Sequence, residues 1–278
     1  MPGLGSMRRR LSSIAKPHPE PTIPPSHSQS DKRLLDPDFF NIDAEDLTWF
    51  HKANLAVRQD VSRLSIAHDY MHIQRVTVAA YQLYCTDTSQ IWAQGIDHRT
   101  VIVAAMVSSM AAVLYAKDNA ENLKDFGPST PDSPDVIQAI QHDLLFDFLR
   151  RLDCPPDVAG PAALIASSIS FELECKDQEK VKDNCEAYPA MRFVQDAVRL
   201  DELGCIGIAR LGAMSKTTIL EAVNRMDTRL RHYPGLMKTK TGKKEAERRW
   251  AQMLEFKEGL LLQSDCSVGL EAGRRKSS

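Results

Sequence analysis

The stretch FVQDAVRLDELGCIGIAR, residues 193–210, decides the fold of this chain. Phe193, Ala197 and Leu200 recur at helical spacing, so one side of a helix here faces a core. Asp196 lies at the edge of that apolar side, where a carboxylate needs an ion pair, hydrogen bonds or a metal ion. Taken alone, this late motif favours an ion pair between Asp196 and a neighbouring arginine on the flank of the helix.

A second stretch, AHDYMHIQRV at residues 67–76, places His68 and His72 four positions apart, on one side of a helix. This early motif and the late motif together resemble the HD-domain superfamily of metal-dependent phosphohydrolases. The resemblance is to the small-domain branch, whose members read HD-x-x-H-x-x-R-V early and D-A-D-R-L-D-A-x-G-A-x-G-I-A-R late. It covers residues 43–262 and implies an all-α fold, a single helical bundle of the HD-domain type.

The resemblance also implies roles for side chains of both motifs. It makes His72 and Asp196 the early and late ligands of a divalent metal, which would polarise a phosphoryl oxygen and activate a water molecule. His68 and Asp69 would then lie nearby, as acid–base groups or as groups that support the ligands.

Three further charged residues follow in the same motifs. Arg75, Arg199 and Asp201 could contact a phosphate or support the ligands. The two arginines could equally pair with the carboxylates of Asp69 and Asp196.

One helix departs from the family pattern. Members of the family read A-A-L-L-H-D, with the His and Asp as central metal ligands, whereas residues 104–109 here read A-A-M-V-S-S. Ser108 and Ser109 therefore stand at the ligand positions, and a neutral hydroxyl is a poor ligand compared with imidazole or carboxylate. Val198 replaces the second Asp of D-A-D. We interpret these changes as the loss of the metal site, with no cofactor expected beyond weak binding of Mn, Fe, Zn or Mg.

Three functional hypotheses follow. The first is a pseudoenzyme, a non-catalytic binding or regulatory module that keeps the fold and a pocket. The second is an enzyme with altered acid–base chemistry around His68, Asp69, His72 and Asp196. A residual metal-dependent phosphohydrolase ranks third, so enzymatic activity stays open. A small molecule or a nucleotide is the expected partner. The tail composition and the M-K-T-x-T-G turn resemble fungal members, some of which accompany small-molecule biosynthesis.

Composition sets the limits of the domain. The chain has 278 residues, of which 43% are hydrophobic, enough for one sizeable core. Residues 1–42 are predicted to be a disordered Pro- and Ser-rich tail, residues 43–263 the helical domain, and residues 264–278 a second tail. The first tail holds Ser12 after three arginines, a pattern typical of a basophilic kinase site, although a plain solvated tail is the favoured interpretation.

Charge and hydropathy exclude several classes of protein. A net charge of -2 gives no support to broad binding of nucleic acid or of an anionic membrane. The apolar run at residues 101–116 is short for a membrane span, so a buried core helix at 100–116 is expected. Without a secretory signal and with six cysteines lacking a C-x-x-C pair, the sequence favours an intracellular, cytoplasmic protein with reduced thiols. The sequence does not indicate the oligomeric state.

Overall fold

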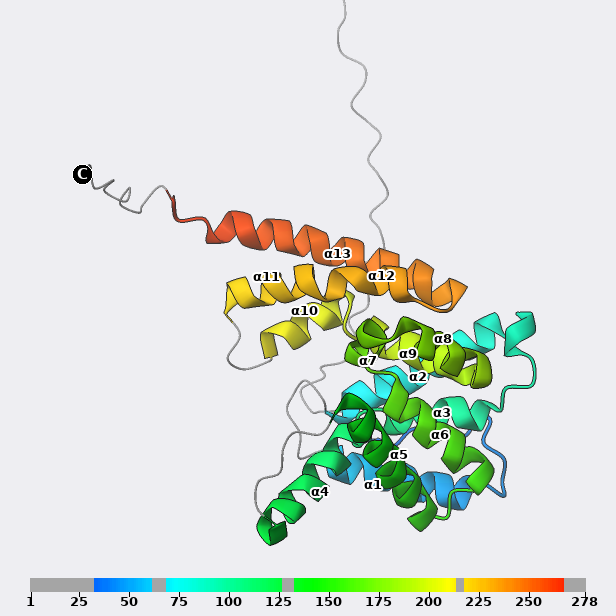
Figure 1. Cartoon of the computed structure of the whole chain (residues 1–278). Coiled ribbons are helices and arrows are strands. Elements are labelled where there is room, and N and C mark those ends of the chain that lie inside the picture. Colours follow the sequence, from blue (N-terminus) through cyan, green and yellow to red (C-terminus); the bar gives the residue numbers. More distant parts are fainter. Residues whose placement is uncertain (1–32, 62–68, 127–132, 214–217, 268–278) are drawn as a thin grey trace, which may run out of the picture. The chain divides into compact units, whose positions relative to one another are not determined.

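The computed structural model describes residues 33–61, 69–126, 133–213 and 218–267 (Figure 1). The chain divides into two units, Met1–Asp31 and Lys32–Ser278, and all the described residues belong to the second. This part is all-helical with no strand, which confirms the predicted fold class. His68, Ser12 and the rest of residues 1–32 and 268–278 lie outside the described residues, so the predictions made for them stay predictions.

The helices follow one another with short connections. In chain order they are α1 (Leu47–Val61), α2 (Tyr70–Asp87), η2 (Ile91–Ala93), α3 (His98–Val107), α4 (Met110–Phe126), α5 (Pro134–Arg151), α6 (Pro156–Ser168), α7 (Phe171–Lys176), α8 (Gln178–Ala187), α9 (Ala190–Leu200), α10 (Gly204–Ala213), α11 (Ile219–Thr228), η3 (Leu230–His232), α12 (Tyr233–Leu236) and α13 (Lys240–Ser264).

Helix α3 is the centre of the core. It packs against α2, α6 and α9, and every residue from Thr100 to Val107 is buried. Such an all-round apolar helix is stable only when other helices cover it on all sides. Helix α9 packs against α2 as well as α3, with Phe193 and Leu200 buried as the spacing of the late motif predicts. The early and late motifs therefore belong to neighbouring helices.

The predicted single helix at residues 100–116 is wrong, because the chain breaks at Ser108 and Ser109. Helix α3 ends at Val107, α4 begins at Met110, and the two axes differ by 50°. The Ser108 amide donates to the Ala105 carbonyl at 3.3 Å, a three-residue spacing that tightens the last turn. Within the described part, no single helix is long and apolar enough to cross a membrane, and this bent pair meets that criterion by length and composition alone.

The domain begins earlier than predicted. Leu35, Phe40 and Ile42 are buried in the core, and the Phe40 ring lies 5.3 Å from the ring of Tyr81 in α2. The predicted boundary at residue 43 is therefore too late. Residues 33–42 form no helix, so helical periodicity could not reveal that they pack.

Helix α13 closes the structure on the side of the late motif. It packs against α10 and α12, and Figure 1 shows it lying along α12. Thr239 caps its start: the Thr239 hydroxyl accepts a hydrogen bond from the Gly242 amide at 2.9 Å. The start of α13 also packs against α9.

Candidate functional site

A cavity of about 210 Å³ lies at the break between α3 and α4. Ser108 and Ser109 line it from the break, and Ser167 and Ser170 line it from the end of α6 and the cap of α7. Val198 of α9 lines the same cavity. The two serines at the central ligand positions and the valine that replaces the second Asp of D-A-D therefore share one site.

Asp196 does not line this cavity, although the resemblance makes it the late metal ligand. Positions 196 and 198 are about 200° apart around a helix, so their side chains point in nearly opposite directions. Val198 points toward the serines, and Asp196 meets the turn before α13. Of the two Asp positions in the family's D-A-D, the second is the one beside Ser108 and Ser109.

Both carboxylate oxygens of Asp196 accept hydrogen bonds from the M-K-T turn. The Lys238 amide donates to Oδ1 at 2.8 Å, and the Thr239 amide and hydroxyl both donate to Oδ2 at 2.8 Å. Asp196 is completely buried, and burial raises its pKa to about 6, although these hydrogen bonds act in the opposite direction. This carboxylate joins α9 to the start of α13.

Arg199 lines the cavity and is anchored by a buried carboxylate behind it. Its guanidinium donates to the carboxylate of Glu174 and to the Leu236 carbonyl, the latter at 3.1 Å. Lys238 also pairs with Glu174. The Arg199 side chain is only 3% exposed. The predicted pairing of Arg199 with Asp196 is therefore wrong, since its carboxylate partner is Glu174.

A second set of charged groups closes the other side of the cavity. Arg229 donates to Glu172 at 2.6 Å and to the Tyr233 hydroxyl at 2.8 Å, and that hydroxyl donates to Glu202 at 3.1 Å. Burial and the neighbouring Glu202 carboxylate raise the pKa of Tyr233, so its hydroxyl stays protonated and remains a donor. All four of these side chains line the cavity.

Two polar atoms at the cavity lack hydrogen bonds to the described residues. They are the hydroxyl oxygen of Ser108 and Nε of Arg199, and both are buried. A buried donor without a partner costs on the order of 1–3 kcal/mol. Both atoms belong to residues that line the cavity, so a polar molecule bound there could satisfy them.

His72 lies in a separate charged cluster. Its Nδ1 is 2.7 Å from Asp201 Oδ2, and Asp201 also receives Arg75 at 2.6 Å and Arg210 at 2.7 Å. Burial alone would raise the pKa of Asp201, but the hydrogen bonds from His72 and Arg75 outweigh it and lower that pKa to about 2. The alternative in which Arg75 pairs with Asp69 is therefore not observed, because its carboxylate partner is Asp201.

Asp69 caps α2. Its Oδ1 accepts from the His72 amide at 2.9 Å, and its backbone is extended as an N-cap requires. Neither Asp69 nor His72 lines the cavity beside Ser108. The structure thus brings Ser108, Ser109 and Arg199 together and places His72, Arg75 and Asp201 in the second cluster.

The side chains around the cavity do not fit a divalent metal. Two hydroxyls stand at the central ligand positions, and a valine stands where the family has the second Asp of D-A-D. The described residues contain no group of three or more His, Cys, Asp or Glu able to hold a metal ion. A metal at Asp196 would have to compete with the three donors from Lys238 and Thr239. Residual metal binding by His72 and Asp196 stays a prediction, and their contacts give it no support.

The sequence analysis missed Glu174, Glu202, Arg229 and Tyr233. Glu202 follows Asp201 inside the late motif, so its place in the motif could have marked it as a candidate site residue. The other three lie outside both motifs and reach the cavity region through tertiary packing of α7, η3 and α12, which no local pattern reveals.

Comparisons with known proteins support the fold. No protein-family model and no curated protein matches the chain. Among solved structures, YpgQ from Bacillus subtilis in complex with ADP is 22% identical, with a TM-score of 0.51, over 76% of this chain and 97% of that one. A protein from Lactobacillus plantarum is 20% identical, with a TM-score of 0.56, over 80% and 98%.

An HD-superfamily hydrolase from Bacillus thuringiensis is also similar, at 20% identity and a TM-score of 0.49, over 79% of this chain and 98% of that one. The all-α fold of this chain is similar to the folds of YpgQ and of the Lactobacillus plantarum protein. At these identities the likeness extends to the fold alone.

Proposed function

We propose that this chain is a non-catalytic protein with an HD-domain-like fold, a binding or regulatory module that holds a small polar molecule in the cavity beside Ser108. One observation carries the proposal. The positions at which the resemblance expects His, Asp and Asp line a single cavity, and they are occupied by Ser108, Ser109 and Val198. Loss of the two central ligand groups, together with the Asp carboxylate that the family carries at position 198, leaves the cavity without the means to activate water through a metal.

The lining of the cavity favours a polar ligand without a large charge. Three cationic groups, of Arg199, Lys238 and Arg229, face three carboxylates, of Glu174, Glu172 and Glu202, so the charges cancel. Serine hydroxyls and the unpartnered Arg199 Nε supply hydrogen bonds. A volume of about 210 Å³ lies below the roughly 300–1,000 Å³ of sites that enclose drug-sized ligands. The ligand is therefore smaller than the ADP present in the YpgQ structure.

A hydrolysis assay tests the non-catalytic part of the proposal. The full-length chain is incubated with Mn²⁺ and nucleoside di- and triphosphates, and released phosphate is measured. We expect release at the level of the protein-free control. Metal-dependent turnover that disappears in the Asp196→Asn variant would contradict the proposal and favour a residual phosphohydrolase.

Ligand-observed NMR with a library of small polyols, amides and amino acids tests the binding part. Ser109→Leu places an apolar side chain in the cavity and should abolish the signal of every fragment that binds there. Ser264→Leu makes the same change at an exposed position at the end of α13 and should leave those signals intact. Fragments that bind both variants equally, or a complete absence of binders, would count against a ligand in this cavity.

A further inference from the structure

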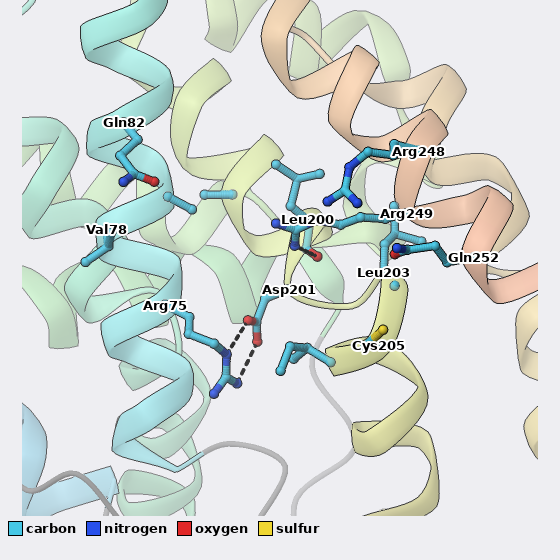
Figure 2. A pocket seen from close by; sticks show the side chains of 14 residues that line it. Arg75, Val78, Gln82, Leu200, Asp201, Leu203, Cys205, Arg248, Arg249 and Gln252 are labelled. Carbon is cyan, nitrogen blue, oxygen red and sulfur yellow. Dashed lines mark hydrogen bonds and ion pairs between the residues drawn. The ribbon is translucent and has the colours of Figure 1, made fainter. Parts of the chain in front are cut away.

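A second and larger cavity, of about 410 Å³, lies between α2, the junction of α9 and α10, and α13. Figure 2 shows Arg75 reaching it from α2, and Arg248 and Arg249 reaching it from α13 on the other side. Three guanidinium groups therefore line one cavity from two helices that are far apart in the sequence. This cavity shares no lining residue with the one beside Ser108.

Each of these guanidinium groups already has an acceptor in the structure. Arg75 donates to both oxygens of Asp201, at 2.6 and 3.0 Å (Figure 2). Arg248 donates to both oxygens of Glu245, at 2.8 and 2.7 Å. Arg249 donates to Glu245 at 2.7 Å and to the Leu200 carbonyl at 2.6 Å. A guanidinium that is already oriented loses less conformational entropy when it binds a ligand.

One terminal nitrogen of each arginine takes no part in these hydrogen bonds. Nη1 of Arg75, Nη1 of Arg248 and Nη2 of Arg249 make no hydrogen bond or ion pair with the residues that the structure describes. Since all three residues line the cavity, these nitrogens can donate to a ligand within it.

The charges around this cavity do not cancel. Arg75 and Arg210 share the carboxylate of Asp201, and Arg248 and Arg249 share that of Glu245. Four guanidinium groups thus face two carboxylates, which leaves an excess of positive charge. Planar guanidinium groups match the geometry of phosphate oxygens, so the excess favours a phosphate group.

The close approach of α13 depends on Gly204 at the start of α10. Gly204 has φ +71°, and a Cβ there would lie 3.2 Å from Cβ and Cγ of Arg249 and from Oε1 of Gln252. A larger residue would push α13 away from α10. The late motif therefore builds one wall of the cavity, and the apolar side chains of Val78, Leu203 and Ile206 complete the lining.

We propose that this cavity binds a small organic phosphate, with the phosphate held by Arg75, Arg248 and Arg249 and an apolar body packed against Val78, Leu203 and Ile206. The apolar lining distinguishes such a ligand from free inorganic phosphate. This site is independent of the small polar ligand proposed for the first cavity, and either could exist without the other.

Isothermal titration calorimetry of the full-length chain with phenyl phosphate, and separately with inorganic phosphate, tests the site. We expect phenyl phosphate to bind, and to bind more tightly than inorganic phosphate. Arg248→Gln removes one charged donor and should weaken phenyl phosphate binding by about tenfold or more. Arg248 is 60% exposed, so this variant should fold normally. Arg249→Lys keeps the charge but loses the fork, and should also weaken binding.

Two controls make the result specific. Lys244→Gln removes one positive charge from an exposed position on the same helix, one turn before Arg248, and should leave the affinity unchanged. Ser109→Leu alters only the first cavity and should also leave it unchanged. The proposal is overturned if the wild type shows no saturable binding of phenyl phosphate. It is equally overturned if Arg248→Gln and Lys244→Gln weaken binding alike, or if an acidic peptide binds in place of the phosphate ester.

Discussion

At the scale of single residues, the buried carboxylates of the two motifs act as anchors between helices. Asp196 holds the turn at Lys238 and Thr239, and Asp201 holds His72 and Arg75. The sequence predicted that Asp196 needs partners, but not which ones. A match to a family motif does not show where a side chain points. The geometry of helix α9 shows that the side chains at positions 196 and 198 point in nearly opposite directions.

Asp196 should make stability depend on pH. Its pKa is raised from 3.8 to about 6 in the folded chain, so the native state binds a proton before the unfolded state does. The stabilising contribution of Asp196 to the free energy of unfolding is therefore complete below pH 3.8 and is lost as pH rises through 6. We expect the free energy of unfolding of the wild type, relative to Asp196→Asn, to rise by on the order of 2–3 kcal/mol from pH 7 to pH 4. Urea denaturation of both proteins across this range measures it, and a constant difference would contradict the prediction.

Glu174 should be among the most sensitive charged positions. Glu174→Gln leaves the Arg199 guanidinium and the Lys238 ammonium without their buried counter-charge. We expect a loss of about 3–5 kcal/mol in the free energy of unfolding. The matched control is Glu179→Gln, whose carboxylate is 83% exposed and pairs loosely with Lys182 at 3.8 Å. That variant should melt like the wild type. Equal melting of the two variants would show that the buried ion pairs contribute nothing.

At the scale of elements, the helices were largely predictable and their breaks were not. The apolar spacing of the late motif predicted the buried face of α9, where Phe193, Ala197 and Leu200 are all buried. The break at Ser108 and Ser109 interrupts an apolar run that periodicity alone reads as continuous, and this break creates the first cavity. Other helices cover α3 on all sides. This tertiary packing stabilises a break at Ser108 and Ser109 that the helix propensity of the local sequence does not require.

The junction of α9 with α13 depends on a glycine. A Cβ at Gly242 would lie 2.5 Å from Asp196 Oδ2 and 2.6 Å from the Thr239 hydroxyl. Gly242→Ala should therefore lower the free energy of unfolding by about 1–3 kcal/mol. Gly259 lies on the same helix with nothing within 4 Å of an added Cβ, so Gly259→Ala should instead raise it by about 0.5–1 kcal/mol. Thermal melts of both variants decide the prediction, and a stabilised Gly242→Ala would refute the close packing.

At the scale of the whole molecule, two short motifs were enough to predict an all-α fold, which the described residues show and which YpgQ and the Lactobacillus plantarum protein share. The same motifs did not predict the site. The cavity collects residues from α6, α7, α9 and α12, whose proximity arises only when the bundle is assembled. The packed segment from Leu35 to Ile42 escaped prediction for a similar reason, because it contributes to the core without helical periodicity.

The metal content of the purified chain tests the central claim most directly, with the variant Ser108→His/Ser109→Asp/Val198→Asp measured beside it. The account predicts far less than one metal ion per chain in the wild type after exposure to Mn²⁺. The triple variant should hold about one and melt at a higher temperature with the metal, because the metal binds the folded state. The variant with only Ser108→His and Ser109→Asp should hold less. A wild type that carries about one metal ion per chain, and loses it on Asp196→Asn, would contradict the account.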